Sequence, residues 1–439
     1  MKGKLGLWTA TSLVIGNMIG AGIFLMPSAM ASFGGISLLG WGLSAIGALF
    51  IARMFSETSK LLPGVDGGPY SYTRAGFGDF TGFLMAWGYW ISVWCTNAAL
   101  VVSLISALST FFPILATDAL LDIITGLAAV WLLTWVNNRG IRTGGEVQLV
   151  TTILKMLPLV FVAITGVFFI RWEHFIPFNR SGTSTMQAVA TTAAMTLYAF
   201  LGVECATIPA GSIKDAERTV SRATMLGTII TSLIYMLGSM SVMGILSAGD
   251  LQHSITPYSD AAAVIAGPNA RYWVSAGAAV AAFGALNGWI LMQGQITLAV
   301  AKDKLFPPLF EKLNKRGVPA GGIILTSVLL SLIMMMNYTR GLVEQFRFTM
   351  MMATMTSVLP FLLVSAAYVI IVMKTRPPNT TVGWIKVLAP ASCAFIFSLL
   401  AILGTGQEIV FWGLGLLLCG TPFYVWNVWK RSKGKLREL

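Results

Sequence analysis

Two glycine-rich interruptions inside long apolar segments are the most informative feature of this sequence. One is GNMIGAGIF, from Gly16 to Phe24, and the other is FLGVECATIP, from Phe200 to Pro209. A helix that unwinds in a bilayer loses backbone hydrogen bonds, which is tolerable only where the freed groups face protein or a water-filled cavity. Freed N–H groups at a helix start favour an anion such as a carboxylate, and freed carbonyls accept hydrogen bonds from an ammonium group. Two such interruptions at corresponding positions of two halves indicate a solute-binding site.

Two ionisable residues also fall deep inside apolar segments, Glu204 beside the second interruption and Lys155 in LKMLP. Each costs about 2.5–3.5 kcal/mol to place at the centre of a membrane helix, so each is a functional candidate by default. A carboxyl or ammonium group in a low dielectric gains or loses its proton more readily than in water. We therefore expect Glu204 and Lys155 to act in proton sensing or coupling. The alternatives are a structural carboxylate at the break for Glu204 and an ammonium that reaches the interface for Lys155.

The composition requires elements that cross a membrane. Of the 439 residues, 56% are hydrophobic and only 10% are charged, whereas about 25% are charged in a soluble domain. Long apolar runs with few charges predict an all-α, polytopic membrane protein. The expected spans are 7–31, 37–55, 81–110, 118–136, 146–170, 186–210, 221–246, 270–298, 319–338, 346–373, 384–403 and 408–429.

The charges sort by side of the membrane. Twenty-three of the 29 Lys and Arg residues fall in the termini and in alternate loops on one face, five fall on the other face, and Lys155 lies within a span. The positive-inside rule predicts both termini in the cytoplasm of a bacterial cell, with the protein in the inner membrane. The net charge of +12 is then topological and requires no nucleic acid partner.

Enzymatic and metal chemistry have little support in the sequence. The two histidines, His174 and His253, fall in loops of the outer face, and the four cysteines show no metal-like spacing or disulfide pattern. No nucleophile motif is evident, so neither an enzyme nor a cofactor is predicted. A channel is a remote alternative, because channels are usually lined by rings of residues from repeated subunits.

The layout predicts two matched halves. Residues 1–170 hold spans one to five and residues 171–374 hold spans six to ten, and each half opens with an interrupted helix. An odd number of spans per half gives the second half the opposite orientation, which makes an inverted repeat. Residues 375–439 hold two further spans and a basic cytoplasmic tail.

With these features, the chain resembles the amino acid–polyamine–organocation transporters over nearly its whole length, and the bacterial arginine/agmatine, lysine/cadaverine and ornithine/putrescine antiporters most closely. The motifs that carry the resemblance are GNMIGAGIF at 16–24, GGPYSY at 67–72, YAFLGVE at 198–204, NGW at 287–289, AKD at 301–303 and LFP at 305–307. The resemblance implies a LeuT-like fold with discontinuous helices one and six, alternating access, and a homodimer.

The resemblance also implies the residues of the site. The α-carboxylate of a free amino acid binds N–H groups of the first break, and the α-ammonium binds carbonyls near Tyr198, Leu201 and Gly202. Tyr198 closes the site and Trp289 packs on the substrate side chain, where an indole face stabilises a cation by roughly 0.5–2 kcal/mol. Lys155 stands where the arginine antiporter has a small apolar residue. It matches instead a lysine of broad-specificity and proton-coupled relatives, where the ammonium replaces a sodium ion and contacts the first break. Glu204 matches a glutamate of pH-dependent coupling in the antiporters. The implied substrate-binding residues are Asn17, Met18, Gly20, Ala21, Gly22, Ile23, Tyr89, Ser92, Asn97, Leu100, Tyr198, Leu201, Gly202 and Trp289.

Three departures bear on the substrate. Ala21 replaces a serine, Leu100 a methionine and Ser92 an alanine of the antiporters that the chain resembles. These changes leave the backbone groups that bind the α-carboxylate and the α-ammonium in place. They weaken the expectation that the transporter is strictly selective for arginine. We therefore predict a sodium-independent exchanger of a cationic amino acid, such as arginine, against an amino acid or its decarboxylated amine. The alternative is a proton-coupled transporter of broad or neutral specificity.

Overall fold

The structure is a computed structural model, and it describes residues 6–20, 22–63, 65, 67–139, 145–207, 213–337 and 340–437. Helices form the regular elements of these residues. The first helices are α1 (Leu7–Met18), α2 (Gly22–Met30), α3 (Ser37–Leu61), α4 (Pro69–Phe77), α5 (Asp79–Ser109), α6 (Ala119–Asn138) and α7 (Gly145–Thr165). They are followed by α8 (Thr185–Leu197), α9 (Ala216–Ile245), α10 (Ala248–His253), α11 (Pro257–Ala266), α12 (Ala270–Lys302), α13 (Ala320–Asn337), α14 (Leu342–Thr375), α15 (Thr381–Gly404), α16 (Gln407–Leu418) and α17 (Thr421–Arg437). Short 3₁₀ turns lie at η1 (Ala31–Ile36), η2 (Pro113–Ala116), η3 (Gly166–Phe169), η4 (Trp172–Phe175), η5 (Tyr198–Phe200) and η7 (Pro308–Phe310).

The described helices are long and apolar enough for a membrane. Eight helical stretches qualify by length and composition, and two shorter apolar helices, Leu154–Phe169 and Ala320–Met336, accompany them. The prediction of an all-α protein with several membrane spans is therefore confirmed. The helix boundaries lie close to those expected from the sequence, but the full number of twelve spans stays a prediction.

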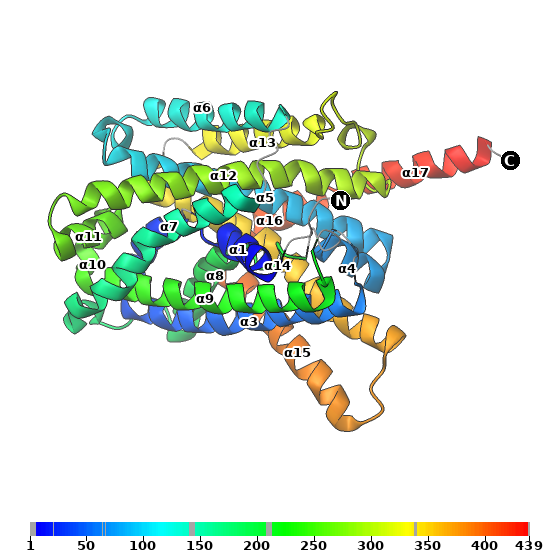
Figure 1. The fold of residues 1–439 in the computed structure, drawn as a ribbon, viewed down its shortest axis with the longest axis horizontal. Coiled ribbons are helices and arrows are strands. Elements are labelled where there is room, and N and C mark those ends of the chain that lie inside the picture. The colour runs from blue at the N-terminus through cyan, green and yellow to red at the C-terminus, as the bar shows by residue number, and fades with distance from the viewer. Residues whose placement is uncertain are drawn as a thin grey trace.

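Two groups of helices pack around the helix breaks. In one group α3 packs along α8 and α9, and α1 packs along α9. In the other α5 packs along α12 and α14, and α13 joins α5, α6 and α12. The apolar window of α5 is 94% buried, so this helix forms the centre of the assembly. Figure 1 shows most of the long helices running in the same general direction between two ends of the molecule.

The two ends of the assembly are distinct. The short helices α10 and α11 lie at one end, at the left of Figure 1, and α4 lies at the other, with α17 projecting beyond it. We call these the α10 end and the α4 end. The segment of α10 and α11 is held by hydrogen bonding of the Ser106 hydroxyl to the Ile255 carbonyl and by an Arg271–Asp260 ion pair of 2.9 Å.

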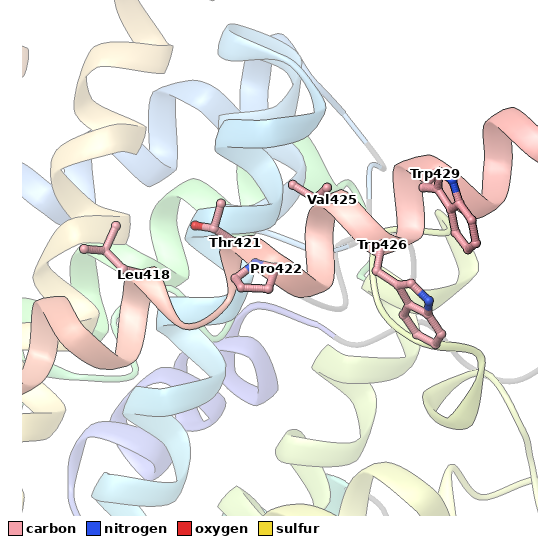
Figure 2. A pocket seen from close by; sticks show the side chains of 6 residues that line it. All are labelled: Leu418, Thr421, Pro422, Val425, Trp426 and Trp429. Atoms are coloured by element: carbon pink, nitrogen blue, oxygen red, sulfur yellow. The ribbon is translucent and has the colours of Figure 1, made fainter.

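The C-terminal helices carry an exposed aromatic surface. Figure 2 shows an apolar groove on α16 and α17, lined by Leu418, Thr421, Pro422, Val425, Trp426 and Trp429. The ammonium of Lys430 lies 3.8 Å from the ring centroid of Trp426. Indole rings beside basic residues are typical of the membrane–water interface.

Candidate substrate site

The first break lies between α1 and α2. Helix α1 ends at Met18, and the Gly20 N–H donates back to the Met18 carbonyl at 2.8 Å, so the chain turns tightly there. Helix ends leave carbonyls without partners, and side chains from other helices satisfy them here. Tyr235 of α9 donates to the Met18 carbonyl at 2.6 Å, and Lys155 of α7 donates to the Gly16 carbonyl. The ammonium of Lys155 thus lies against the end of α1, in a side chain that is only 3% exposed.

Helix α2 starts the second part of the broken segment. It begins at Gly22, and the first N–H groups of any helix have no acceptor within it. These groups, with the positive end of the helix dipole, form a place where a carboxylate is stabilised. Ala21, which is also predicted to bind substrate, lies outside the described residues.

The second break follows η5. Leu201 is extended and residues 201–207 form successive turns instead of a helix. The Tyr198 carbonyl accepts from the Leu201 N–H at 3.1 Å, and the Gly202 carbonyl accepts from the Cys205 N–H at 3.0 Å. The expectation that these two carbonyls are free is therefore wrong, because tight turns re-form bonds over three residues. Each keeps a second lone pair for a ligand.

The two breaks touch at Gly202. This residue has a φ of +106°, a conformation that residues with a Cβ rarely adopt. A Cβ placed on it would lie 3.0 Å from the carbonyl carbon of Asn17 and 3.1 Å from the nitrogen of Met18. The sequence needs glycine here both for the backbone angle and for the close approach of the first break.

A small cavity lies between the breaks. Its volume is about 20 Å³, room for about one water molecule, so it must widen to admit an amino acid. Nine of the predicted binding residues line it: Asn17, Met18, Gly20, Gly22, Ile23, Leu100, Tyr198, Leu201 and Trp289. Thr96 and Ala199 also line it and were not predicted. Thr96 lies one helical turn before Leu100 in α5, so the helical period from Leu100 was the signal that pointed to it.

Aromatic rings close the cavity. The ring of Tyr198 lies over Gly22, where an added Cβ would be 2.5 Å from the Tyr198 Cε1 atom. Phe346 of α14 packs edge-to-face on Tyr198, with ring centroids 5.9 Å apart, and the Tyr198 hydroxyl lies 3.4 Å from the Thr96 carbonyl. Trp289 reaches the cavity from α12 and is 3% exposed. Tyr198 therefore links both breaks to α5 and α14.

A larger cavity opens toward the α4 end. Its volume is about 550 Å³, and Asn17 lines both it and the small cavity. Its wall includes Tyr70 of α4, whose hydroxyl donates to Asp303 at 2.7 Å. Arg74 pairs with Asp303 at 2.8 Å and with Asp79 at 2.7 Å. Burial, followed by the hydrogen bond to Asp303, raises the pKa of Tyr70 above its usual value, so it stays a neutral donor. These contacts fix α4 to the ends of α5 and α12. We call this cavity the vestibule.

Glu204 lies beside the vestibule in the turns of the second break. Its carboxyl group accepts hydrogen bonds from the Tyr89 hydroxyl of α5 and from the Gly202 N–H at 3.2 Å. The side chain is fully buried, while Tyr89 and Cys205 line the vestibule. The carboxyl group of Glu204 thus connects the second break to the central helix α5.

Two further predicted residues lie in α5 away from the cavity lining. The Ser92 hydroxyl donates to the Tyr89 carbonyl at 2.7 Å, within its own helix. The Asn97 amide donates to Gln293 of α12 at 3.0 Å, and Gln293 in turn donates to α13. In the ranges that the structure describes, no group of three or more His, Cys, Asp or Glu residues is placed to hold a metal ion.

Comparison with known proteins gives the family. The family model described as amino acid permease matches residues 5–417. A putative arginine/ornithine antiporter of Bacillus subtilis is 32% identical and covers 98% of both chains. A cadaverine/lysine antiporter of Escherichia coli is 33% identical over 77% of each chain, and an arginine/ornithine antiporter of Pseudomonas aeruginosa is 34% identical over 74% of this chain and 69% of its own. These relatives are transporters and not enzymes. This chain therefore belongs to the amino acid permease family, within the amino acid–polyamine–organocation superfamily.

Proposed function

We propose that this protein is a sodium-independent exchanger that carries a cationic amino acid, such as arginine, against an amino acid or its decarboxylated amine. The observation that carries the proposal is the cavity enclosed by the two helix breaks. It combines a helix N-terminus for a carboxylate, backbone carbonyls for an ammonium and the indole of Trp289 for a cationic side chain. The names of the relatives, which describe antiporters of arginine, ornithine, lysine and cadaverine, favour the same class of substrate.

The proposed topology follows the charges. Twelve spans in the inner membrane place both termini and the α4 end in the cytoplasm and the α10 end outside. The spans of residues 1–170 and 171–374 form two inverted repeats, and those of 375–439 lie outside them. A homodimer through the exposed faces of α16 and α17 is consistent with their low burial, because only 22% of that apolar window is buried within one chain.

Transport then proceeds by alternating access. The group containing α1, α3, α8 and α9 rocks against the group containing α5, α12 and α13, around the small cavity. Because Asn17 lines both the vestibule and the small cavity, we assign the described conformation as the one that opens toward the cytoplasm. Separation of the breaks from α5 and α12 enlarges the cavity for substrate, and Tyr198 and Phe346 bar the way to the α10 end.

Lys155 and Glu204 have coupling roles in this proposal. The ammonium of Lys155 against the Gly16 carbonyl supplies a positive charge at the end of α1, which removes the need for a bound sodium ion there. Glu204 senses protons at the second break through its contacts with Tyr89 and Gly202. Protonation of the Glu204 carboxylate weakens its hydrogen bond from Tyr89, and this bond is what holds the second break against α5.

A second candidate function is proton-coupled transport of neutral amino acids. It is favoured by the lining of the small cavity, in which no described residue is Asp or Glu. A cationic side chain would then rely on Trp289 and on carbonyl groups alone.

Counterflow in liposomes separates the two functions. Purified protein is reconstituted, the liposomes are loaded separately with arginine, agmatine, lysine, alanine or leucine without sodium, and labelled arginine is added outside. The proposal expects accumulation when arginine or agmatine is inside and little when alanine or leucine is inside. Accumulation with neutral amino acids, or none with arginine, would favour the second candidate.

A further inference from the structure

A second cavity, which is polar, lies at the α10 end. Tyr198 and Phe346 lie between it and the vestibule. Its volume is about 720 Å³, and Gln252 of α10 and Gln187 of α8 contribute to its lining. Arg347 of α14 lines it and directly follows Phe346, which packs on Tyr198 of the substrate cavity. Adjacent residues of α14 therefore contact the two regions: Arg347 lines this cavity, and Phe346 packs on the Tyr198 ring that closes the substrate cavity.

Three guanidinium groups from different parts of the chain converge on this cavity. Arg347 is half-buried, and its guanidinium carbon lies 5.5 Å from the ring centroid of Phe33. Arg180 is held beside the same segment, because its backbone N–H donates to the Phe33 carbonyl at 3.0 Å. Arg340 lies one helical turn before Glu344 and is 3.5 Å from its carboxylate.

The positive charges of the cavity are only partly matched. The carboxylates in its lining are Glu344, which pairs with Arg340, and Glu408. Among the described residues, neither Arg347 nor Arg180 has a carboxylate within 4.0 Å of its guanidinium. Arg180 is exposed, whereas Arg347 is half-buried and is stabilised electrostatically by Glu344. The planar donors of a guanidinium fit a carboxylate in two-point contact. The lining thus carries three guanidinium groups and two carboxylates, an excess of positive charge that favours a carboxylate ligand.

We propose that Arg347, assisted by Arg180 and Arg340, binds the α-carboxylate of a free amino acid at the α10 end before it passes Tyr198. This inference rests on the proposed function, because it takes an amino acid as the substrate. Such a site would make the α10 end of the pathway prefer the amino acid over its decarboxylated amine. An amino acid is attracted to the arginines by its carboxylate, whereas its decarboxylated amine carries only positive charge and is repelled.

The test compares substrate concentrations for half-maximal exchange at the α10 end. Right-side-out membrane vesicles with the full chain are loaded with unlabelled arginine, and labelled arginine or labelled agmatine is supplied outside. For Arg347→Gln we expect the external KM for arginine to rise roughly 2- to 10-fold, the range for losing a partly exposed charge-assisted contact. The external KM for agmatine should stay the same or fall. Arg347→Lys should recover part of the arginine KM.

The matched control is Arg171→Gln, an exposed arginine of the same end that does not line the cavity, and it should leave both KM values unchanged. An equal rise of both KM values in Arg347→Gln, or no rise for arginine, would overturn the inference. In that case exchange by the wild type would still support the proposed function. A wild type that exchanges neither solute would sink both. An effect that is equal for both solutes and vanishes in liposomes of purely zwitterionic phospholipid would assign the arginines to an anionic lipid headgroup and overturn the inference.

Discussion

Substitution of Gly202 by alanine should disable exchange, because this glycine is where the two helix breaks meet. Its φ of +106° costs a residue with a Cβ about 1–3 kcal/mol. The new methyl group would also lie 3.0 Å from the Asn17 carbonyl carbon and 3.1 Å from the Met18 nitrogen. Both neighbours are backbone atoms, so relief requires that one break move away from the other. A penalty of about 1–3 kcal/mol lowers the population of the described conformation roughly 5- to 150-fold.

The assay is counterflow of labelled arginine, with thermal unfolding in detergent measured on the same preparations. Gly202→Ala should lower the exchange rate at least about fivefold and lower the unfolding temperature. The matched control is Gly284→Ala in α12, where an added Cβ meets no atom within 4 Å. This control should exchange normally and unfold at the same or a slightly higher temperature, because alanine favours a helix over glycine. Wild-type exchange and stability in Gly202→Ala would refute the reasoning.

Three further substitutions test other parts of the site. Trp289→Leu should weaken arginine binding about 2- to 30-fold and alanine binding much less, since only the cationic side chain loses its indole face; isothermal titration checks this, and equal losses would contradict it. Lys155→Met should reduce exchange at least about tenfold because it leaves the Gly16 carbonyl without its donor, whereas Lys155→Gln keeps a donor and should retain more counterflow than the methionine variant. Arg74→Gln should lower the unfolding free energy by only about 1 kcal/mol, because Arg74 and Asp303 are 35% and 40% exposed; a loss of several kcal/mol on chemical denaturation would show that α4 is held more strongly than this.

The breaks and the helices around them were predictable from the sequence. Glycines inside apolar runs mark places where a membrane helix unwinds, and α1 indeed stops at Met18 while the second break begins after Phe200. Long apolar segments separated by charged loops gave helix boundaries close to the observed ones. These signals are local, so one sequence suffices to read them.

The contacts between distant segments were harder to predict. Tyr235 is an aromatic residue in a long apolar helix, and nothing in its surroundings in the sequence shows that it donates to Met18. Phe346 is likewise one of 25 phenylalanines, and only the packing of α14 brings it onto Tyr198. The carbonyls of Tyr198 and Gly202 were expected to be free because unwinding was equated with lost hydrogen bonds. Their turns keep short-range bonds that a sequence pattern does not reveal.

Sodium-independent exchange is the central claim, and one measurement addresses it directly. Labelled arginine is supplied, without sodium, to liposomes that contain the wild-type protein and are either loaded with unlabelled arginine or empty. The account predicts that label accumulates in loaded liposomes above its outside concentration and hardly enters empty ones. Equal entry into both, or entry that requires sodium, would contradict it.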